Sequence, residues 1–196
     1  MQIRIKTNIY CYYITKFWFT TQEYTLTITG FQVNDTVFTL DDLKTKFPKV
    51  DVTTVIQCNG NRREDFHYVD GKTPAFGPPH WVAGAIGNST WSGARLRDVL
   101  RASGMEVDNI SLGKKDVPNH WMVGLLGYDM DEVGNQYCCS FPFDKAVDPF
   151  GDVILAYEMN GEPIPRSHGY PVRAIVPGQL DFVFIGHLRD SRLSEV

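Results

Sequence analysis

The stretch VIQCNGNRRED, from Val55 to Asp65, places a cysteine between the end of a strand and a polar turn that leads into two arginines. Residues 50–57 are rich in β-branched side chains, which favours a strand ending just before Cys58. The adjacent Arg62 and Arg63 create a positive field that favours the thiolate, a nucleophile and a soft metal ligand. Their forked guanidinium groups also suit oxyanions. The residues alone leave open the alternative of a small core cysteine beside arginines in surface salt bridges.

On the N-terminal side of this stretch, the sequence predicts a strand and then a short helix. Apolar residues alternate with threonines from Tyr24 to Gly30, which is typical of a half-buried strand. Thr39 and Asp42 form a capping pair for a helix over residues 40–46, which Pro48 must end.

On the C-terminal side, a long irregular segment precedes another helix and several strands. Gly and Pro residues interrupt the chain between Cys58 and Trp81, and long loops of this kind usually carry function. We expect a helix that is capped by Ser92 and ends at Gly104. Further strands are expected at about residues 121–126, 153–157, 171–176 and 182–185, with a turn at Asn160 and Gly161.

Length and composition indicate one globular domain. The chain has 196 residues, of which 43% are hydrophobic and 21% charged, and these values exclude a disordered or coiled-coil protein. The net charge of −4 argues against a broad nucleic-acid-binding face. No apolar run is long enough for a membrane span. The four cysteines have the spacing of neither a disulfide framework nor a zinc site. We therefore predict an α+β fold with mixed β-sheets and few short helices.

Three blocks, in order along the chain, resemble the molybdenum-binding domain of the sulfite oxidase family, which includes eukaryotic nitrate reductases. The first block is IQCNGNRR, from Ile56 to Arg63, in which Asn59 stands where the family has alanine. The second block starts at Trp81 and continues as GAIGNSTWSGARLRDVL over residues 84–100. The third is DVILAYEMNGEPIPRSHGYPVRAIVPG, residues 152–178.

The resemblance implies a site for a molybdenum–molybdopterin cofactor. Cys58 matches the cysteine that binds the metal in the family, and its thiolate is a suitable soft donor. His168 and Arg173 match residues that contact the pterin cofactor, and Asp129 matches a further cofactor contact.

The resemblance also implies a pocket for a small anionic substrate. Arg63 matches an arginine that binds the oxyanion, Tyr157 a tyrosine that contacts substrate or metal oxygen, and Trp81 a tryptophan of the pocket wall. Taken alone, Tyr157 is better interpreted as a strand tyrosine packed in the core.

The activity implied by the resemblance is oxidation of sulfite to sulfate by oxygen-atom transfer. A nitrate-reductase-like enzyme and a non-catalytic member of the family are the alternatives, and a cysteine hydrolase using Cys58 with His168 is a weaker one. No feature of the sequence identifies the electron acceptor.

Both ends of the chain depart from the family pattern, which has an Arg-Asn-His segment before the first strand and a histidine and lysine soon after the third block. We therefore predict a divergent N-terminal segment over residues 1–23, a molybdopterin-binding domain over 24–178 and a divergent C-terminal segment over 179–196. The family's dimerisation domain and haem motif have no counterpart, so a monomer without haem is expected. The first acidic residue is Glu23, a feature shared with organelle transit peptides, and a mitochondrial location is expected, with cytoplasm or peroxisome as alternatives.

Overall fold

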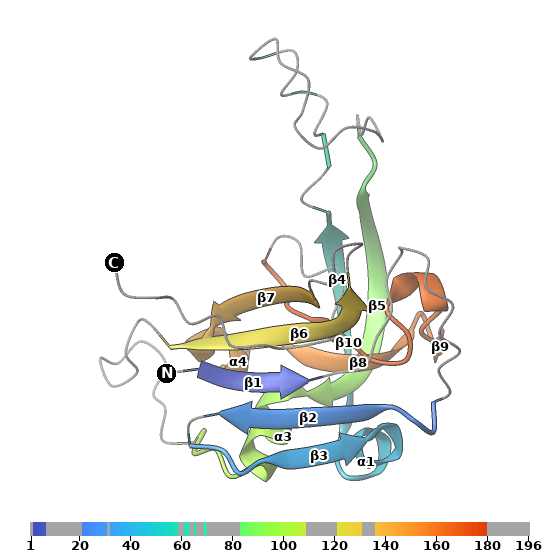
Figure 1. Cartoon of the computed structure of the whole chain (residues 1–196). Coiled ribbons are helices and arrows are strands. Elements are labelled where there is room, and N and C mark those ends of the chain that lie inside the picture. The colour runs from blue at the N-terminus through green and yellow to red at the C-terminus, as the bar shows by residue number, and fades with distance from the viewer. Residues whose placement is uncertain are drawn as a thin grey trace.

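The computed structural model describes residues 2–6, 21–30, 32–58, 61–62, 65, 69, 83–108, 121–130 and 136–179. The described strands form two sheets, A and B (Figure 1). Sheet A contains, in spatial order, β3 (Thr36–Thr39), β2 (Thr25–Gly30), β1 (Gln2–Lys6), β6 (Met122–Met130) and β7 (Gln136–Pro142). Sheet B contains β10 (Arg173–Ile175), β8 (Ile154–Met159), β5 (Ile86–Arg95) and β4 (Lys49–Gln57), with β9 (Glu162–Pro163) beside β8.

Sheet A mixes parallel and antiparallel pairs, whereas the strand pairs of sheet B are antiparallel. β1 pairs parallel to β6 and antiparallel to β2. The described helices are short: α1 (Leu40–Thr45), α3 (Leu96–Ala102), α4 (Phe143–Val147) and the 3-10 helix η1 (Arg166–His168). The expected α+β fold with mixed sheets and few short helices is confirmed.

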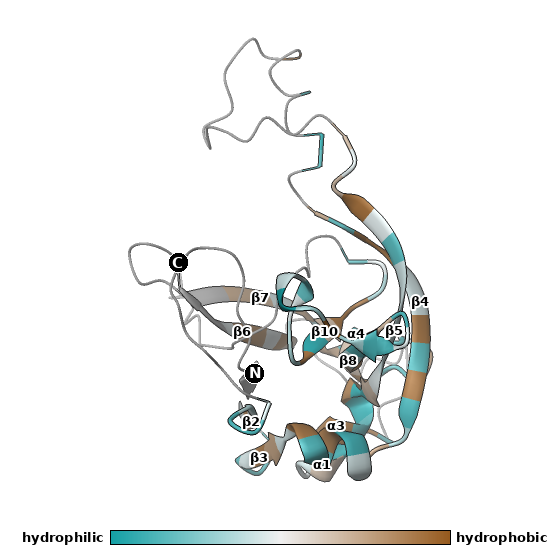
Figure 2. Cartoon of the chain, turned by 90° about the vertical axis from the view of Figure 1, so that its right-hand side faces the viewer, coloured by the Kyte–Doolittle hydropathy of each residue, from teal (hydrophilic) through white to brown (hydrophobic). Residues whose placement is uncertain are grey.

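The main hydrophobic core is formed by both sheets and by the helices. Leu26 from β2, Leu125 from β6 and Leu155 from β8 are at most 1% exposed and belong to this core. α1 and α3 contribute Leu43 and Leu100, and both helices lie at the lower end of the molecule (Figures 1 and 2). Burial of one stripe on each short helix accounts for their stability, since helices of this length are marginal alone.

A second, smaller cluster covers the opposite face of sheet B. Its buried members are Val52, Trp91, Ile154, Ala156, Ile164 and Ile175. Side chains alternate between the two faces of a strand, and neighbours on β8 accordingly divide between the clusters: Ile154 and Ala156 join the smaller one, Leu155 and Tyr157 the main core. We call the side of sheet B that carries the smaller cluster its outer face.

The short helix predicted before Pro48 is confirmed, together with its capping pair. Thr39 is the N-cap of α1, and its side chain accepts a hydrogen bond from the backbone N–H of Asp42. The Asp42 carboxylate accepts one in return from the Thr39 N–H at 2.9 Å. Two N–H groups at the helix start are thereby satisfied reciprocally.

The helix expected from Ser92 begins later than predicted. Ser92 lies inside β5, where it pairs with Glu158, and α3 starts after Arg95, which makes no side-chain cap. Pairing with β4 on one side and β8 on the other extends the strand through residues that local capping preference assigns to a helix start. The expected end is correct, because Gly104 has a left-handed φ of +88°.

Five strands were not predicted: β1, β3, β5, β7 and β9. β1 lies within the predicted N-terminal segment 1–23, yet occupies the centre of sheet A, between β2 and β6. The predicted strand over 182–185 lies outside the described residues. Cys138 and Cys139 are neighbours on β7, where Cys138 is exposed and Cys139 packs on the core, as expected for adjacent strand residues.

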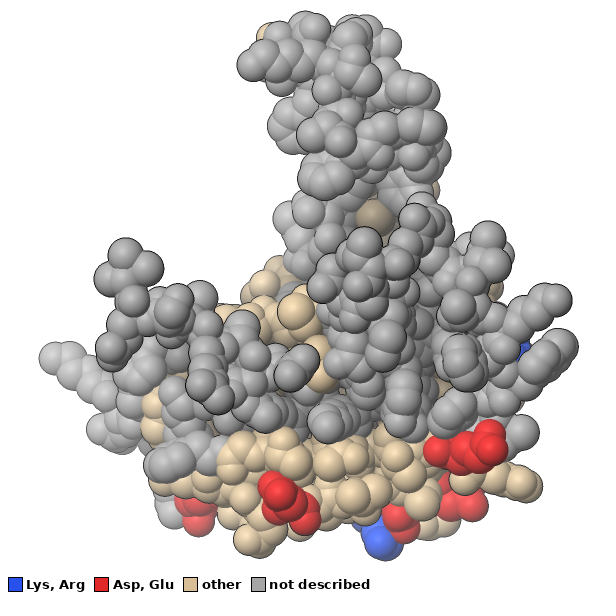
Figure 3. Space-filling view, in the orientation of Figure 1, with Lys and Arg blue, Asp and Glu red and all other residues tan. Residues whose placement is uncertain are grey.

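The far ends of β4 and β5 project beyond the rest of both sheets (Figure 1). Gln57 pairs with Ile86 at the tip, and Val55 and Ile86 are about half exposed there. On the face shown in Figure 3, acidic side chains lie along the lower edge, near α1 and β3. None of the described helices has the length and apolar character needed to cross a bilayer.

Candidate functional site

Cys58 directly follows the last residue of β4 and is held by backbone hydrogen bonds. Its N–H donates to the Ala85 carbonyl at 2.9 Å, and its carbonyl accepts from the Asn61 N–H at 2.9 Å. The Asn61 side chain in turn accepts from the Ala85 N–H at 3.1 Å. Cys58 is partly buried. The strand alternation of Val52 and Ile56, which pack in the outer-face cluster, places Cys58 next on that face.

Arg62, the first of the two adjacent arginines, forms a surface ion pair. Its guanidinium lies 2.6 Å from the Asp65 carboxylate, and its side chain is 71% exposed. An exposed pair of this kind contributes about 0–1 kcal/mol to stability. For Arg62 the structure therefore matches the surface salt bridge that we considered as the alternative to oxyanion binding. Arg63 and Trp81 lie outside the described residues.

Arg173 is a buried cation on the outer face of sheet B. It lies in β10 opposite Ala156 of β8 and is 4% exposed. One guanidinium nitrogen, Nη1, donates to the His168 carbonyl at 3.0 Å. The guanidinium carbon lies 4.9 Å from the centre of the Trp91 ring. A buried guanidinium is costly unless it is well solvated by neighbours, and its position here argues for a specific use.

The backbone carbonyl of His168 contacts Arg173, whereas His168 itself is exposed to solvent. It closes η1, and the following Gly169 has a φ of +100° that returns the chain toward β10. The imidazole Nδ1 lies 2.8 Å from the Ser167 hydroxyl, and His168 is exposed. The structure therefore brings His168 and Arg173 together, as the sequence predicts.

Tyr157 does not join these groups. It follows Ala156 on β8 and packs in the main core, on the opposite face of the sheet from Arg173. It is 4% exposed, and the Lys44 amino group lies 5.6 Å from its ring centre. Desolvation raises the pKa of its hydroxyl, with a smaller contribution from Glu158. This position matches the alternative of a strand tyrosine packed in the core.

Asp129 belongs to the other sheet. It lies near the end of β6, and its side chain is outside the described part of the structure.

Cys58 and Arg173 share a face of sheet B but lie at different levels of it. Trp91, whose ring meets Arg173, pairs with Val52. Cys58 is six positions beyond Val52, which corresponds to about 20 Å of extended chain. The two groups do not form a compact pocket, and a ligand contacting both would have to be elongated.

The donors on the outer face suit a ligand that is anionic and rich in hydrogen-bond acceptors. The indole N–H of Trp91 is buried and finds no partner among the described residues. A buried donor without a partner destabilises the protein by about 1–3 kcal/mol, which an acceptor on a ligand would offset. With the Arg173 guanidinium and the Cys58 thiol, the donor set fits a cofactor that carries a phosphate, a heterocycle and a soft metal. In the described part of the chain, no three His, Cys, Asp or Glu residues group as a metal site.

Trp91 is a residue that the sequence-based analysis did not select. Its segment was assigned to a helix start, so its place on the outer face was not foreseen. The register of β5 against β8 is what brings the ring to Arg173, and no local pattern encodes that register.

Comparison with known proteins identifies the family. The family model described as the oxidoreductase molybdopterin binding domain matches residues 14–195, nearly the whole chain. The chain belongs to this family. The match runs beyond residues 24–178, to which the sequence-based resemblance was limited.

Two curated relatives illustrate the range of the family. The chain is 45% identical over 157 residues to the mitochondrial sulfite oxidase of Drosophila melanogaster, covering 80% of this chain and 25% of that protein. It is 36% identical over 161 residues to nitrate reductase (NADH) 1 of Oryza sativa subsp. japonica, covering 79% of this chain and 16% of the other. The chain therefore spans about a quarter or less of the length of these relatives.

A solved structure shares the fold. The sulfane dehydrogenase SoxCD of Paracoccus pantotrophus aligns with a TM-score of 0.60 and 27% identity, over 91% of this chain and 41% of that one. The expected sulfite-oxidase-type molybdopterin-binding fold is thereby confirmed.

Proposed function

We propose that the protein is a molybdenum-cofactor-dependent oxidoreductase that oxidises sulfite to sulfate. The observation that carries this proposal is that a thiol just past the end of β4 and the buried guanidinium of Arg173 lie on the same face of sheet B, separated by about 20 Å of extended chain, in a chain of this family. Sulfite oxidases of several animals are among its relatives.

Within this proposal, Cys58 and Arg173 hold opposite parts of the cofactor. Cys58 supplies a thiolate ligand to the metal, and its backbone is fixed by Ala85 and Asn61. Arg173 binds the pterin part, where a phosphate accepts two parallel N–H bonds from a guanidinium. The exposed ring of His168 offers a further donor beside Arg173, and Asp129 is proposed as an additional contact.

The substrate is proposed to be a small oxyanion bound by Arg63, with Trp81 forming part of the pocket wall. A guanidinium stabilises the extra negative charge of the substrate by preorganised hydrogen bonds. When bound, the cofactor supplies the two-electron redox chemistry of oxygen-atom transfer. We assign Tyr157 a packing role in this proposal, because the tyrosine lies in the main core.

The names of the animal relatives support a mitochondrial location. We propose this location for the protein, with no membrane or nucleic-acid partner assigned.

Turnover of sulfite tests the proposal directly. The protein, purified from a host that makes the cofactor, should reduce an artificial one-electron acceptor in the presence of sulfite, and Cys58→Ser should abolish this activity. Cys138→Ser is the matched control, because Cys138 is exposed on β7 in the other sheet. Cofactor-loaded protein without sulfite turnover, or equal turnover by Cys58→Ser, would overturn the proposal.

Nitrate reduction is the second candidate, favoured by the similarity to the rice nitrate reductase. A competition experiment distinguishes the two. Under the leading proposal, nitrate neither supports turnover nor inhibits sulfite oxidation at equal concentration. Nitrate-dependent oxidation of a reduced dye would favour the second candidate, and bound cofactor with neither activity would favour a non-catalytic member of the family.

A further inference from the structure

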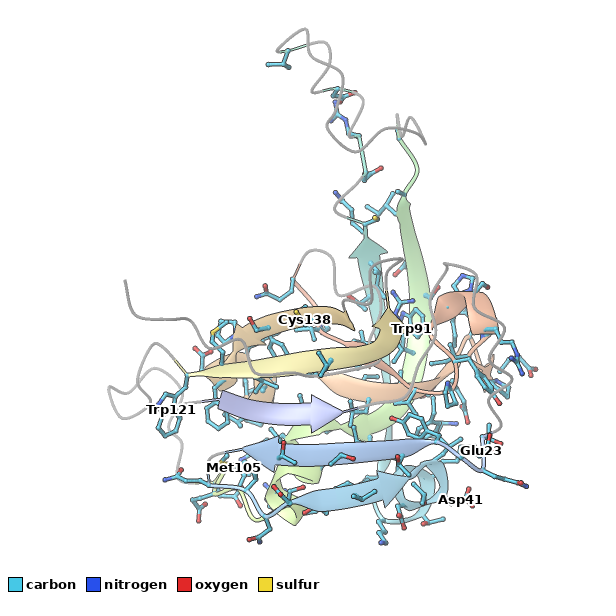
Figure 4. All side chains as sticks on the ribbon, viewed as in Figure 1. Glu23, Asp41, Trp91, Met105, Trp121 and Cys138 are labelled. Carbon is cyan, nitrogen blue, oxygen red and sulfur yellow. The ribbon has the colours of Figure 1, made fainter. Side chains whose placement is uncertain are left out.

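The Arg173 guanidinium is held against the flat face of the Trp91 indole. Its central carbon lies 4.9 Å from the ring centre, and the two residues are 4% and 2% exposed. A guanidinium over an indole face is attracted by the ring quadrupole, and the attraction is larger when both groups are removed from water. Figure 4 shows Trp91 at the base of the projecting ends of β4 and β5.

Two further contacts restrict the same side chain. The His168 carbonyl accepts a hydrogen bond from Arg173 Nη1 at 3.0 Å. Gly169 approaches the aliphatic part of Arg173 so closely that a Cβ at position 169 would lie 3.1 Å from its Cβ and Cδ. The Trp91 indole thus restrains one face of the guanidinium, and the His168 carbonyl restrains one of its nitrogens. Gly169 restrains the aliphatic part of the Arg173 side chain.

Strand register explains why the indole reaches the guanidinium. Arg173 pairs with Ala156 of β8, and Ala156 pairs with Gly93 of β5. Gly93 and Trp91 are two positions apart and share the outer face. The missing side chain of Gly93 lets the β8 backbone approach β5 closely, because a Cβ there would lie 2.6 Å from the Ala156 Cα.

We propose that Trp91 is a positioning residue for Arg173, holding its guanidinium in the orientation that binds the anionic part of the pterin cofactor. The inference rests on the proposed function for the identity of the ligand, the pterin cofactor. The packing of Trp91 against Arg173 is present in the chain without that ligand. Preorientation avoids the entropic cost of ordering a long side chain when the ligand binds.

The first experiment needs no cofactor and measures the exposure of Arg173 in the isolated chain. Phenylglyoxal modifies accessible guanidinium groups, and peptide mass spectrometry gives the rate at Arg173. We expect slow modification in the wild type and in Trp91→Phe, which keeps an aromatic face, and a rate about tenfold higher in Trp91→Leu. Ile164→Ala, which removes volume from the same cluster, is the control and should keep the slow rate. Equal rates in the wild type and Trp91→Leu would overturn the proposal.

The second experiment measures retention of the cofactor. Loss of bound pterin on dilution, followed by its fluorescence, should be about tenfold faster in Trp91→Leu than in the wild type and near the wild-type rate in Trp91→Phe. In an Arg173→Met background, Trp91→Leu should add nothing, since the tryptophan acts through the arginine. If Trp91→Leu accelerated pterin loss as much in the Arg173→Met background as in the wild type, Trp91 would have a merely structural role. Trp91→Met replaces Trp91→Leu in both experiments if the leucine variant does not fold.

The two experiments separate the two proposals. If the wild-type chain carries no pterin, the proposed function fails, while the modification rates still decide whether Trp91 positions Arg173. If pterin is bound but neither rate responds to Trp91→Leu, the positioning role fails and the proposed function stands.

Discussion

Gly93 of β5 lies so close to Leu155 of β8 that a Cβ at position 93 would be 2.1 Å from the Leu155 carbonyl oxygen. It would also lie 2.6 Å from the Cα of Ala156. The pairing of the two strands shifts register between Ser92 and Gly93, so the close approach coincides with a bulge. Because the obstructing atoms belong to the backbone, neither strand can yield without moving the sheet.

We predict that Gly93→Ala destabilises the fold. Overpacking of this kind costs about 1–3 kcal/mol, and more when backbone must move. Thermal unfolding followed by circular dichroism should give a Tm lower by about 2–4 °C per kcal/mol for a chain of this size. Gly87→Ala on the same strand is the control, because a Cβ there meets nothing within 4 Å. Equal melting temperatures for the two variants would contradict the close approach of β5 and β8.

The lowered pKa of Asp42 leads us to predict that the stability of the fold depends on pH. Its pKa is lowered from 3.8 to about 2, mainly by the hydrogen bond with Lys46 and then by the Thr39 backbone N–H. A depressed pKa in the folded state means that the carboxylate stabilises the fold above the unfolded value of about 4 and loses this effect as the pH falls toward 2.

The variant Asp42→Asn should therefore be less stable than the wild type at pH 7, with a difference that shrinks as the pH falls toward 2, as measured by urea unfolding at each pH. Asp41→Asn removes the same charge from the same helical turn without touching the Lys46 ion pair, and is the matched control. A constant difference between Asp42→Asn and the wild type from pH 7 to pH 2 would argue against the pair.

Variants of Tyr157 distinguish a packing role in the core from a catalytic role. Tyr157→Phe keeps the ring in the main core, so stability should change by about 1 kcal/mol or less and sulfite turnover should persist. Tyr157→Ala should cost about 3–5 kcal/mol because it opens a cavity. A fall in turnover of about 100-fold or more in a stable Tyr157→Phe protein would instead indicate proton transfer by the hydroxyl.

Local patterns predicted the fold best where the backbone hydrogen-bonding groups of a segment find their partners within the same segment. The capping pair at Thr39 and Asp42 and the left-handed Gly104 were identified because the partners are only a few residues apart. The start of α3 was misplaced, since β5 continues through Ser92 by pairing with β4 and β8. Strand pairing joins distant segments, and no local preference encodes it.

The same distinction applies to the candidate site. Resemblance to a family selected His168 and Arg173, and the structure brings them together through one hydrogen bond. The resemblance also selected Tyr157, whose side chain points toward the main core because side chains alternate along β8. Trp91 escaped detection because its contact with Arg173 depends on the register of three strands.

The most direct measurement is the molybdenum and pterin content of the protein after purification from a host that makes the cofactor. Elemental analysis and pterin fluorescence should give the metal and the pterin in near-equal amounts, both approaching one per chain when loading is complete. Folded protein that contains neither group would contradict the assignment of Cys58 and Arg173 as the residues that hold the cofactor.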